Sequence, residues 1–391
     1  MHPSERLYGS TDNRLGGNTV LLCITGSIAA TETVKLAREI IRHGGRVVPL
    51  MTRAAVELIG PKSIEFACGN APVTDLTGRV EHISLLSGGK SVVVVAPATA
   101  DVIGKIANGI ADDAVTALCL NALGSAIPVI IAPSMGATML DNPFVRANMD
   151  RLRRQGVNVL PSVMAENEAK LPDFQSIISE AARCFSGGRL KRRSVLVVGG
   201  AGEQPLDEVR FITSRSSGAT AVEIATAAYE QKANVMMLSG RMEVSAPSFI
   251  PSRRFRTLED IESFAAGRRF DIVIVPASLP DFIPAAARGK ISSDRDVTLR
   301  LKRAPKFIDD IRGRCRVLVA FKAETGGEKQ LIEKARTRLK QSGADIIVAN
   351  NISDVGANST RAFIVTEDDV QKFEGTKRGL AELIIDRVCS I

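Results

Sequence analysis

The stretch NTVLLCITGSIAATETVKLAREIIRHGG, residues 18–45, has the pattern of a strand followed by a helix. The apolar run Thr19–Thr25 has the length and continuity of a strand that is buried on both faces. Over Thr33–His43 the apolar side chains recur at helical spacing, at Val34, Ala37, Ile40 and Ile41. Gly44–Gly45 then ends the helix, so the stretch predicts one strand–helix unit of an α/β fold.

The same alternation recurs in two series. Further strand-like runs of the first series are residues 47–52, 91–96, 128–132 and 157–160. After Ser186–Gly188 a second series begins, with strand-like runs at residues 195–198, 234–238, 271–275, 317–321, 345–349 and 363–366. Helical stretches such as Ala219–Gln231 and Glu328–Ser342 lie between them. Continuously apolar strands that alternate with helices indicate parallel sheets, so we predict an α/β protein with two doubly wound parallel-sheet domains.

The length of 391 residues also suits two domains, since one ordinary domain has roughly 100–200 residues. We expect a polar leader at residues 1–17, a first domain at 18–185, a basic linker at 186–193 and a second domain at 194–391. The leader has no apolar signal core. We therefore expect it to be disordered and the protein to be cytoplasmic.

The composition excludes several classes of function. The longest apolar runs are strand-sized, so no membrane partner is expected. A net charge of +8 could indicate nucleic acid, but Trp is absent and no basic run is interleaved with aromatic residues. The basic balance suits an enzyme of phosphorylated substrates instead. Six scattered cysteines and three histidines predict neither disulfides nor a histidine-rich metal site.

Ligands of open α/β sheets bind beyond the carboxyl ends of the strands. The segment Thr25–Ile28, TGSI, can place backbone N–H groups on an anion there, although an ordinary capped turn has the same residues. Thr52 adds a hydroxyl after the second strand, and Pro97–Thr99 gives a small surface after the third for a flat ring. His82 lies just ahead of the third strand, where it is either catalytic or structural.

The first half resembles the flavin-dependent cysteine decarboxylases with a flavodoxin-like fold, over residues 18–180. The matching pieces, in order, are GSIAA (26–30), MTRAA (51–55), His82, APATA (96–100), GKIANGIADD (104–113) and PSMGATM (133–139). The resemblance implies an FMN site formed by Gly26, Ser27, Ile28, Thr52, Pro97, Ala98 and Thr99. It also implies that His82 is catalytic, acting on the substrate carboxylate, and that the substrate is bound by Met135, Gly136 and Met139.

Two positions depart from that family. Gly136 stands where an asparagine is usual. The stretch Pro161–Phe174, which corresponds to the substrate-covering loop, has no cysteine to protonate the enethiolate intermediate. Lys170 and Glu166 are the candidate replacements.

In the second half, Arg210–Gly218 reads RFITSRSSG, which is either a polar turn or a loop that holds an anion. Gly199–Gly202, GGAG, superficially resembles a dinucleotide loop. The full G-x-G-x-x-G spacing fails because Pro205 follows, so an NAD site is the weaker interpretation of these glycines.

Residues 194–391 resemble the phosphopantothenate–cysteine ligases, with a Rossmann-like fold. The matching pieces are residues 199–218 (GGAGEQPLDEVRFITSRSSG), 276–282 (PASLPDF), 289–294 (GKISSD), 301–309 (LKRAPKFID), 321–325 (FKAET) and 344–351 (ADIIVANN). The resemblance implies that CTP, accompanied by Mg²⁺, activates an acid as an acyl-cytidylate, which the amine of cysteine then attacks. It implies a catalytic role for Ser214 and Lys290. Substrate would be bound by Arg210, Ser216, Ser217 and Gly218, and CTP by Asp281, Lys290, Phe321 and Arg338.

Some positions depart from the ligase pattern as well. Lys306 stands in place of an aspartate, Ala219 and Thr220 in place of lysine and methionine, and Ser214 in place of an asparagine. A serine hydroxyl is shorter than an asparagine amide and has one donor fewer.

Both halves together predict a bifunctional enzyme of coenzyme A biosynthesis that acts on 4′-phosphopantothenate, cysteine and CTP. One alternative is a diverged FMN- or nucleotide-binding regulatory protein that has lost one or both activities. Another is a different FMN enzyme, such as a flavin prenyltransferase, which the ligase-like half disfavours. The resemblance also implies a homo-oligomer, with trimeric contacts between decarboxylase halves and dimeric contacts between ligase halves.

Overall fold

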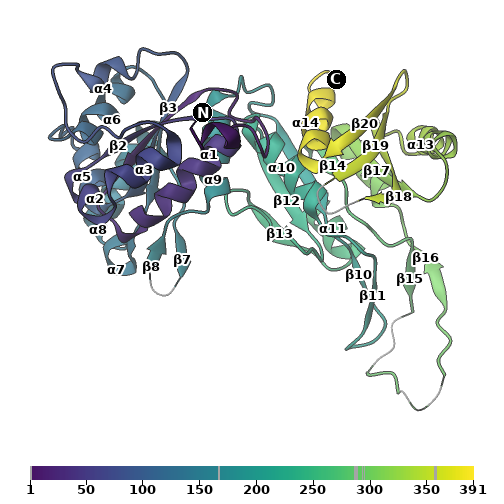
Figure 1. Ribbon diagram of the computed structural model, residues 1–391. Coiled ribbons are helices and arrows are strands. Elements are labelled where there is room, and N and C mark those ends of the chain that lie inside the picture. The colour runs from purple at the N-terminus through teal and green to yellow at the C-terminus, as the bar shows by residue number, and fades with distance from the viewer. Residues whose placement is uncertain (1, 166–167, 286–288, 293, 295, 356–358) are drawn as a thin grey trace. The chain divides into compact units, whose positions relative to one another are not determined.

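The computed structural model describes residues 2–165, 168–285, 289–292, 294, 296–355 and 359–391. The chain divides into two compact units, Met1–Gly187 and Gly188–Ile391 (Figure 1). Within the described residues, no helix is both long and apolar enough to cross a bilayer.

The N-terminal unit is built on a five-stranded parallel sheet of order β2-β1-β3-β4-β6. The strands are β1 (Thr19–Ile24), β2 (Arg46–Met51), β3 (Ser91–Ala98), β4 (Val129–Pro133) and the short β6 (Asn158–Val159). β3, in the centre, is buried along its whole length, as expected for a strand covered on both faces.

Helices cover both faces of this sheet. One core contains side chains of α1 (Thr33–Arg42), α3 (Pro61–Cys68) and α9 (Phe174–Phe185). The other contains side chains of α5 (Ala100–Ala107), α6 (Ala114–Gly124) and α8 (Pro143–Arg154). Short elements complete the unit: η1 (Glu5–Leu7), η2 (Ile28–Glu32), α2 (Arg53–Leu58), α4 (Glu81–Ser84), α7 (Ala137–Leu140) and a small sheet of β5 (Met135–Gly136), β7 (Val163–Ala165) and β8 (Glu168–Lys170).

The expected disorder of the leader is wrong. Leu15 is fully buried in the core with α1, and its backbone N–H donates to the carbonyl oxygen of His43. Oδ1 of Asp12 is hydrogen-bonded to Nδ1 of His43 at 2.8 Å, and Oδ2 pairs with Nη2 of Arg14 at 2.7 Å. The polar side chains that suggested a flexible segment therefore bond to one another against the end of α1.

The C-terminal unit contains an eight-stranded sheet of order β13-β12-β9-β14-β17-β18-β19-β20. Its strands are β9 (Ser194–Gly199), β12 (Asn234–Ser239), β13 (Ser252–Arg254), β14 (Phe270–Val275), β17 (Cys315–Glu324), β18 (Ile346–Val355), β19 (Ser359–Val365) and β20 (Val370–Thr376). Six strands are parallel, but β19 and β20 are antiparallel to their neighbours. The sheet is thus mixed at one edge, because the connection from β18 to β19 is too short for a crossover.

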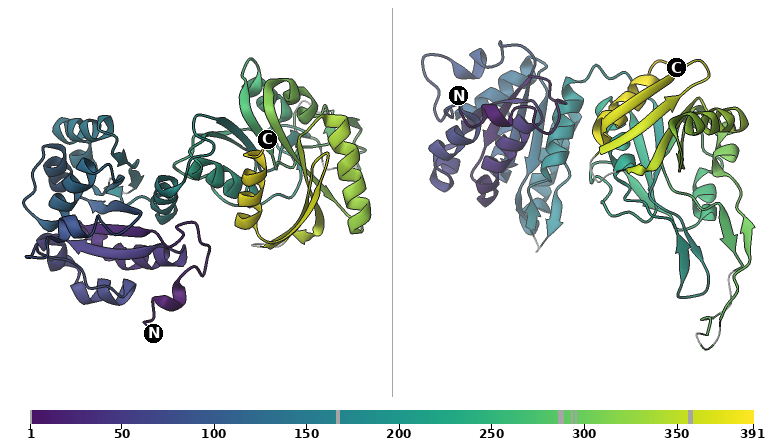
Figure 2. Two further views of the ribbon diagram at one scale, coloured as in Figure 1. Left: turned by 90° about the horizontal axis from the view of Figure 1, so that it is seen from above. Right: turned by 45° about the vertical axis from the view of Figure 1, so that its right-hand side comes forward.

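Helices again cover both faces. α10 (Ala219–Glu230) and α14 (Lys377–Val388) pack on one face, and α11 (Leu258–Ala265), α12 (Phe307–Ile311) and α13 (Glu328–Ser342) pack on the other. η3 (Arg312–Arg314) follows α12. Two antiparallel hairpins, β10 (Glu203–Pro205) with β11 (Phe211–Thr213) and β15 (Phe282–Pro284) with β16 (Leu301–Arg303), contact each other and extend from this unit in the same direction (Figures 1 and 2).

Candidate active sites

The carboxyl ends of β1 and β3 are joined by one buried side chain. The hydroxyl of Thr25 donates to the carbonyl oxygen of Pro97 at 2.7 Å and accepts from the backbone N–H of Thr99 at 3.1 Å. Thr99 in turn caps α5 with its own hydroxyl. The first and third sequence motifs, which the resemblance assigned to FMN, therefore lie side by side.

The ends of β2 and β4 lie at the same edge. The hydroxyl of Ser27 lies 3.3 Å from that of Ser134, which follows β4, and the Ser134 N–H donates to the carbonyl oxygen of Ala98. Thr52, after β2, donates its N–H to Ile24 and caps α2 with its hydroxyl. The structure thus brings all the predicted cofactor residues to one edge of the sheet.

The residue types at this edge fit a flavin. Gly26 lies so close to α2 that an added Cβ would be 2.6 Å from Cβ of Ala54, so the turn after β1 has no room for a side chain. Ala98 is small and fully buried, and its carbonyl oxygen accepts from the backbone N–H of Ser134 at the same edge. A ring with a phosphate tail needs such a combination of a small surface and hydrogen-bonding groups.

His82 lies on α4, which packs against α6. Its side chain is half-buried, and Nδ1 is buried without a hydrogen-bond partner among the residues that the structure describes. Buried ring nitrogens normally have partners, so this atom is free for a ligand group. Among the residues that the structure describes, no hydrogen bond or ion pair joins His82 to the hydroxyl-lined edge.

The predicted substrate residues of this half are tied to the predicted covering loop. β5, which consists of Met135 and Gly136, pairs with β8, so the hairpin β7–β8 lies directly beside the PSMG motif. A Cβ added at Gly136 would meet no atom within 4 Å, so the backbone there leaves open space where a side chain would start. Met139 is exposed on α7. Glu166 lies outside the described residues, and Lys170 ends β8.

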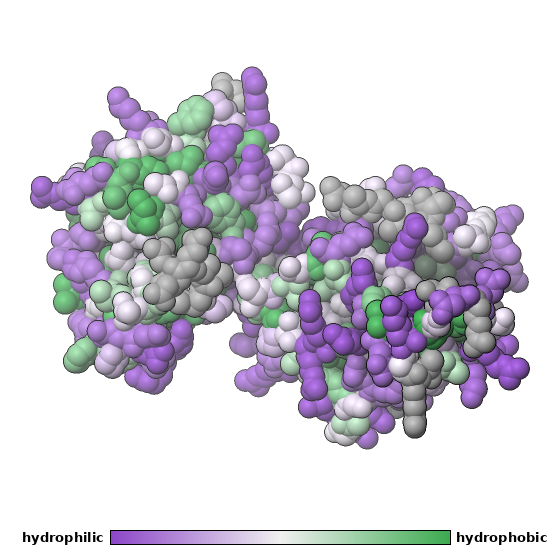
Figure 3. Space-filling view, turned by 90° about the horizontal axis from the view of Figure 1, so that it is seen from below, coloured by the Kyte–Doolittle hydropathy of each residue, from purple (hydrophilic) through white to green (hydrophobic). Residues whose placement is uncertain are grey.

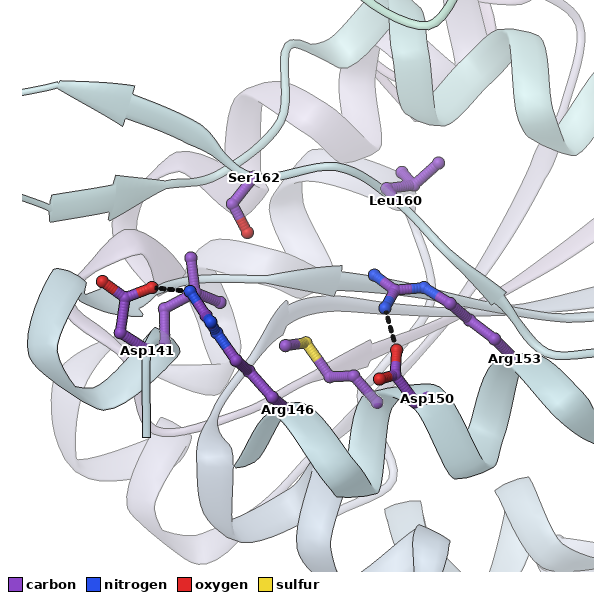
Figure 4. Close-up of a pocket in the computed structure, with 8 residues that line it drawn as sticks. Asp141, Arg146, Asp150, Arg153, Leu160 and Ser162 are labelled. Atoms are coloured by element: carbon purple, nitrogen blue, oxygen red, sulfur yellow. Dashed lines mark hydrogen bonds and ion pairs between the residues drawn. The ribbon is translucent and has the colours of Figure 1, made fainter. Parts of the chain in front are cut away.

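A pocket of about 290 Å³ lies beside α7 and α8, lined by Leu140, Asp141, Arg146, Met149, Asp150, Arg153, Leu160 and Ser162 (Figure 4). Arg146 pairs with Asp141 at 2.5 Å, and Arg153 pairs with Asp150 at 2.8 Å. These charges cancel in pairs, and none of the predicted site residues lines the pocket. It therefore adds nothing to the flavin site.

In the C-terminal unit, the glycine loop after β9 is bonded on both sides. Ala201 exchanges backbone hydrogen bonds with Arg241, in the loop after β12. Ser278, in the loop after β14, donates to Gly200 and accepts from Gly202. Three strand ends, and with them the motifs at 199–202 and 276–282, are thereby joined at the edge where ligands of such sheets bind.

The segment Arg210–Gly218 is more than a turn. It contains β11, which pairs with β10, and it ends at Gly218, the N-cap of α10. Gly218 has φ +76°, and an added Cβ would be 2.4 Å from Sδ of Met242, so only glycine fits. Ser214 is exposed, and Ser216 and Ser217 are half-buried at the start of the helix.

The predicted catalytic lysine lies near the start of this segment. Arg210 donates from Nη1 to the carbonyl oxygen of Ile291 at 3.2 Å, and Lys290 precedes Ile291 in the chain. Lys290 is exposed. The structure therefore brings together Arg210 and the Lys290 backbone, which are 80 positions apart in sequence.

The remaining predicted CTP residues are more dispersed. Asp281 forms an ion pair with Lys306, the residue that replaces the usual aspartate. Phe321 packs on the face of the sheet covered by α10 and α14. Arg338 belongs to α13, on the opposite face, where it pairs with Asp309 at 2.8 Å. The structure thus does not bring Arg338 and Phe321 together.

Three residues were missed by reasoning from the sequence. Thr25 lay within a quoted motif, but nothing in a single sequence shows which hydroxyl bonds to another strand end. Ser134 has the same property. Asp207, in the PLDEVR stretch, had no visible signal because the residue that it holds, Ile291, is 84 positions away.

The family comparisons agree with both halves. The Flavoprotein family matches residues 9–186, and the family described as DNA/pantothenate metabolism flavoprotein C-terminal domain matches residues 190–391. The fold therefore belongs to a two-domain flavoprotein of pantothenate metabolism.

Full-length relatives give the particular family. The coenzyme A biosynthesis bifunctional protein CoaBC of Thermococcus kodakarensis is 37% identical over an alignment of 401 positions, which covers 99% of each chain. That of Methanocaldococcus jannaschii is 32% identical over 99% of this chain and 97% of its own. A crystal structure of the FMN-dependent cysteine decarboxylase SpaF is also similar, with 35% identity, 43% of this chain and 97% of that chain covered, and a TM-score of 0.40. The chain belongs to the family of bifunctional coenzyme A biosynthesis proteins.

The comparisons confirm the resemblance to both enzyme families, the two α/β domains and the prediction of a bifunctional enzyme. The chain is an enzyme of coenzyme A biosynthesis, with a flavoprotein decarboxylase half and a ligase half.

Proposed function

We propose that the chain first joins 4′-phosphopantothenate to cysteine with CTP and then decarboxylates the product to 4′-phosphopantetheine with FMN. One observation supports the pair of activities: each unit has its own sheet edge where the predicted site residues gather after the strand ends. One edge is lined by hydroxyls at four strand ends, and the other is formed by the glycine loop with the lysine-bearing segment.

In the ligase step, the substrate carboxylate attacks the α-phosphate of CTP and pyrophosphate leaves. The cysteine amine then attacks the acyl carbon, and CMP leaves. Lys290 and Arg210 supply the positive charge that the triphosphate and the carboxylate require, accompanied by Mg²⁺. Ser214, Ser216, Ser217 and Gly218 hold the acyl-cytidylate, and Asp281 and Phe321 contact the nucleotide. Arg338 lies on the opposite face of the sheet, paired with Asp309, and is left out of the proposed CTP site.

In the decarboxylase step, bound FMN would supply a reversible two-electron oxidation of the cysteinyl thiol, and it would return both electrons after carbon dioxide leaves, so that the step has no net redox change. Gly26, Ser27 and Ile28 hold its phosphate, while Thr52 and Pro97–Thr99 contact the rest of the cofactor. His82 binds the substrate carboxylate and positions it for loss of carbon dioxide. Met135, Gly136 and Met139 bind the remainder of the substrate beneath the β7–β8 hairpin.

Assembly into a homo-oligomer is part of the proposal, with trimers of decarboxylase halves and dimers of ligase halves in the cytoplasm. Support comes from the surface of the N-terminal unit, where apolar side chains gather among polar ones (Figure 3). Ile28, Ile83 and Phe144 are large apolar residues that are 72%, 54% and 79% exposed. A patch of apolar surface such as the one that Figure 3 shows on this unit is typical of protein contacts.

The test for the ligase half is pyrophosphate release from CTP in the presence of 4′-phosphopantothenate and cysteine. Lys290→Ala should abolish this release and leave the flavin spectrum intact. Lys191→Ala, an exposed lysine in the segment before β9, is the matched control and should behave as the unaltered enzyme. Unchanged release from the Lys290 variant would remove that residue from the site, and equal release with ATP would contradict CTP as the specific nucleotide.

A further inference from the structure

The turn between β10 and β11 contains a carboxylate with no solvent exposure. The side chain of Asp207 is 0% exposed, although the Arg210 side chain beside it is 43% exposed. Oδ1 of Asp207 accepts from the backbone N–H groups of Val209, at 2.8 Å, and Arg210, at 2.6 Å. This oxygen therefore fixes the local turn that leads into the RFITSRSSG segment.

The other oxygen holds a distant part of the chain. Oδ2 accepts from the backbone N–H of Ile291 at 3.0 Å, while the Ile291 carbonyl accepts from Arg210. The peptide groups on both sides of Ile291 are thus bonded to the turn. A weaker bond of 3.3 Å runs from the N–H of Gly289 to Glu208. Lys290 lies between these two anchored residues.

The carboxyl group of Asp207 is ionised at neutral pH. The hydrogen bond from Ile291, and then those from Val209 and Arg210, keep the pKa of the carboxyl below its usual range in spite of desolvation. With both oxygens occupied by N–H donors and the side chain inaccessible, Asp207 has no free position for a metal ion or a substrate proton.

We propose that Asp207 is a positioning residue of the ligase half, which sets the place of Lys290 relative to the substrate segment Arg210–Gly218. This inference rests on the proposed function, in which Lys290 contacts the triphosphate. A lysine side chain is flexible, so its ammonium group reaches a defined position only if the backbone that carries it is fixed. One buried carboxylate provides that hold by joining two segments more than 80 residues apart.

Asp207→Asn separates the two functions of the carboxylate. The amide oxygen can keep the bonds from Val209 and Arg210, but the NH₂ group then faces the N–H of Ile291, donor against donor. Glu208→Gln is the matched control, because its single bond from Gly289 needs only an oxygen, which the amide retains.

The first measurement is amide hydrogen exchange on the full chain without substrates. Asp207→Asn should accelerate exchange in a peptide that contains residues 289–292, with the rest of the C-terminal unit unchanged and Glu208→Gln unchanged throughout. Unaltered exchange of that peptide, or acceleration spread over the whole unit, would overturn the positioning role.

The second measurement is the steady-state rate of pyrophosphate release. Asp207→Asn should lower kcat by about tenfold to a hundredfold, the range for a small misplacement of a catalytic group, with KM for 4′-phosphopantothenate within about twofold. A normal kcat in this variant would overturn the inference alone. Absence of pyrophosphate from the unaltered enzyme would instead overturn the proposed ligase function, and the positioning role with it.

Discussion

The hydroxyl of Thr25 accepts a hydrogen bond from the backbone N–H of Thr99, although 74 residues separate them. The same hydroxyl donates to Pro97, and the side chain is completely buried. One atom therefore fixes the spacing between the turn after β1 and the end of β3, the two segments that we propose to bind FMN.

Thr25→Val should weaken flavin binding and the N-terminal unit together. The valine leaves the Thr99 N–H and the Pro97 carbonyl without their partner, which costs about 1–3 kcal/mol for a buried group. Flavin titration and thermal unfolding measure the two effects. Thr25→Ser retains the hydroxyl and is the control; equal flavin affinity in the valine variant would show that the bond does not support the site.

Gly26→Ala should also weaken flavin binding, for a steric reason. The new Cβ would be 2.6 Å from Cβ of Ala54, and such overpacking costs about 1–3 kcal/mol. The double variant with Ala54→Gly removes the clash, at a helix cost of about 1 kcal/mol, and should recover most of the affinity. If the double variant binds flavin no better than Gly26→Ala, the close contact is not the cause.

His82→Asn should stop carbon dioxide release from supplied 4′-phosphopantothenoylcysteine. The buried Nδ1, which has no partner among the described residues, is the atom expected to meet the substrate carboxylate. The flavin spectrum and pyrophosphate release from CTP should not change. Carbon dioxide release at the normal rate would exclude His82 from catalysis. Loss of bound flavin would indicate that His82 has a structural role instead.

Asp12→Ala should destabilise the N-terminal unit by about 3 kcal/mol, the lower end for breaking a buried ion pair. Burial by itself raises the pKa of Asp12, but hydrogen bonds from His43 and Arg14 and their charges outweigh it and lower that pKa well below its usual range. Its contribution is therefore present above the pKa that Asp12 has in the unfolded chain and is lost only as pH falls toward the much lower folded value.

Chemical unfolding at neutral pH, followed by release of flavin, measures this effect. Glu39→Gln, which alters the partly exposed pair with Arg42, should change stability by no more than about 1 kcal/mol. Equal stabilities of the Asp12 variant and the unaltered protein would mean that residues 2–17 do not support the fold.

The regular elements were largely predictable from the sequence. β1 and α1 follow the pattern of residues 18–45, because burial on both faces leaves a continuous apolar run and an amphipathic helix leaves a spaced one. The antiparallel direction of β19 could not be read, since an apolar run shows burial and not direction. The packed segment around Asp12 was also missed, because polar side chains that bond to one another look the same in sequence as solvated ones.

The site was predictable at the level of motifs and not of contacts. Position after a strand end located Gly26, Thr52 and Pro97 at one edge, as the shared direction of parallel strands requires. Bonds such as that from Ile291 to Asp207 depend on how two loops meet in space, and neither loop carries a periodic signal.

The central claim is that one chain carries out both reactions in sequence. The most direct test mixes the purified protein with 4′-phosphopantothenate, cysteine, CTP and Mg²⁺, and follows pyrophosphate and carbon dioxide separately. We predict one equivalent of each product per 4′-phosphopantothenate consumed, with carbon dioxide appearing after pyrophosphate. Pyrophosphate without carbon dioxide would leave only the ligase, and the absence of both products would contradict the account and favour a binding protein that has lost its catalytic activities.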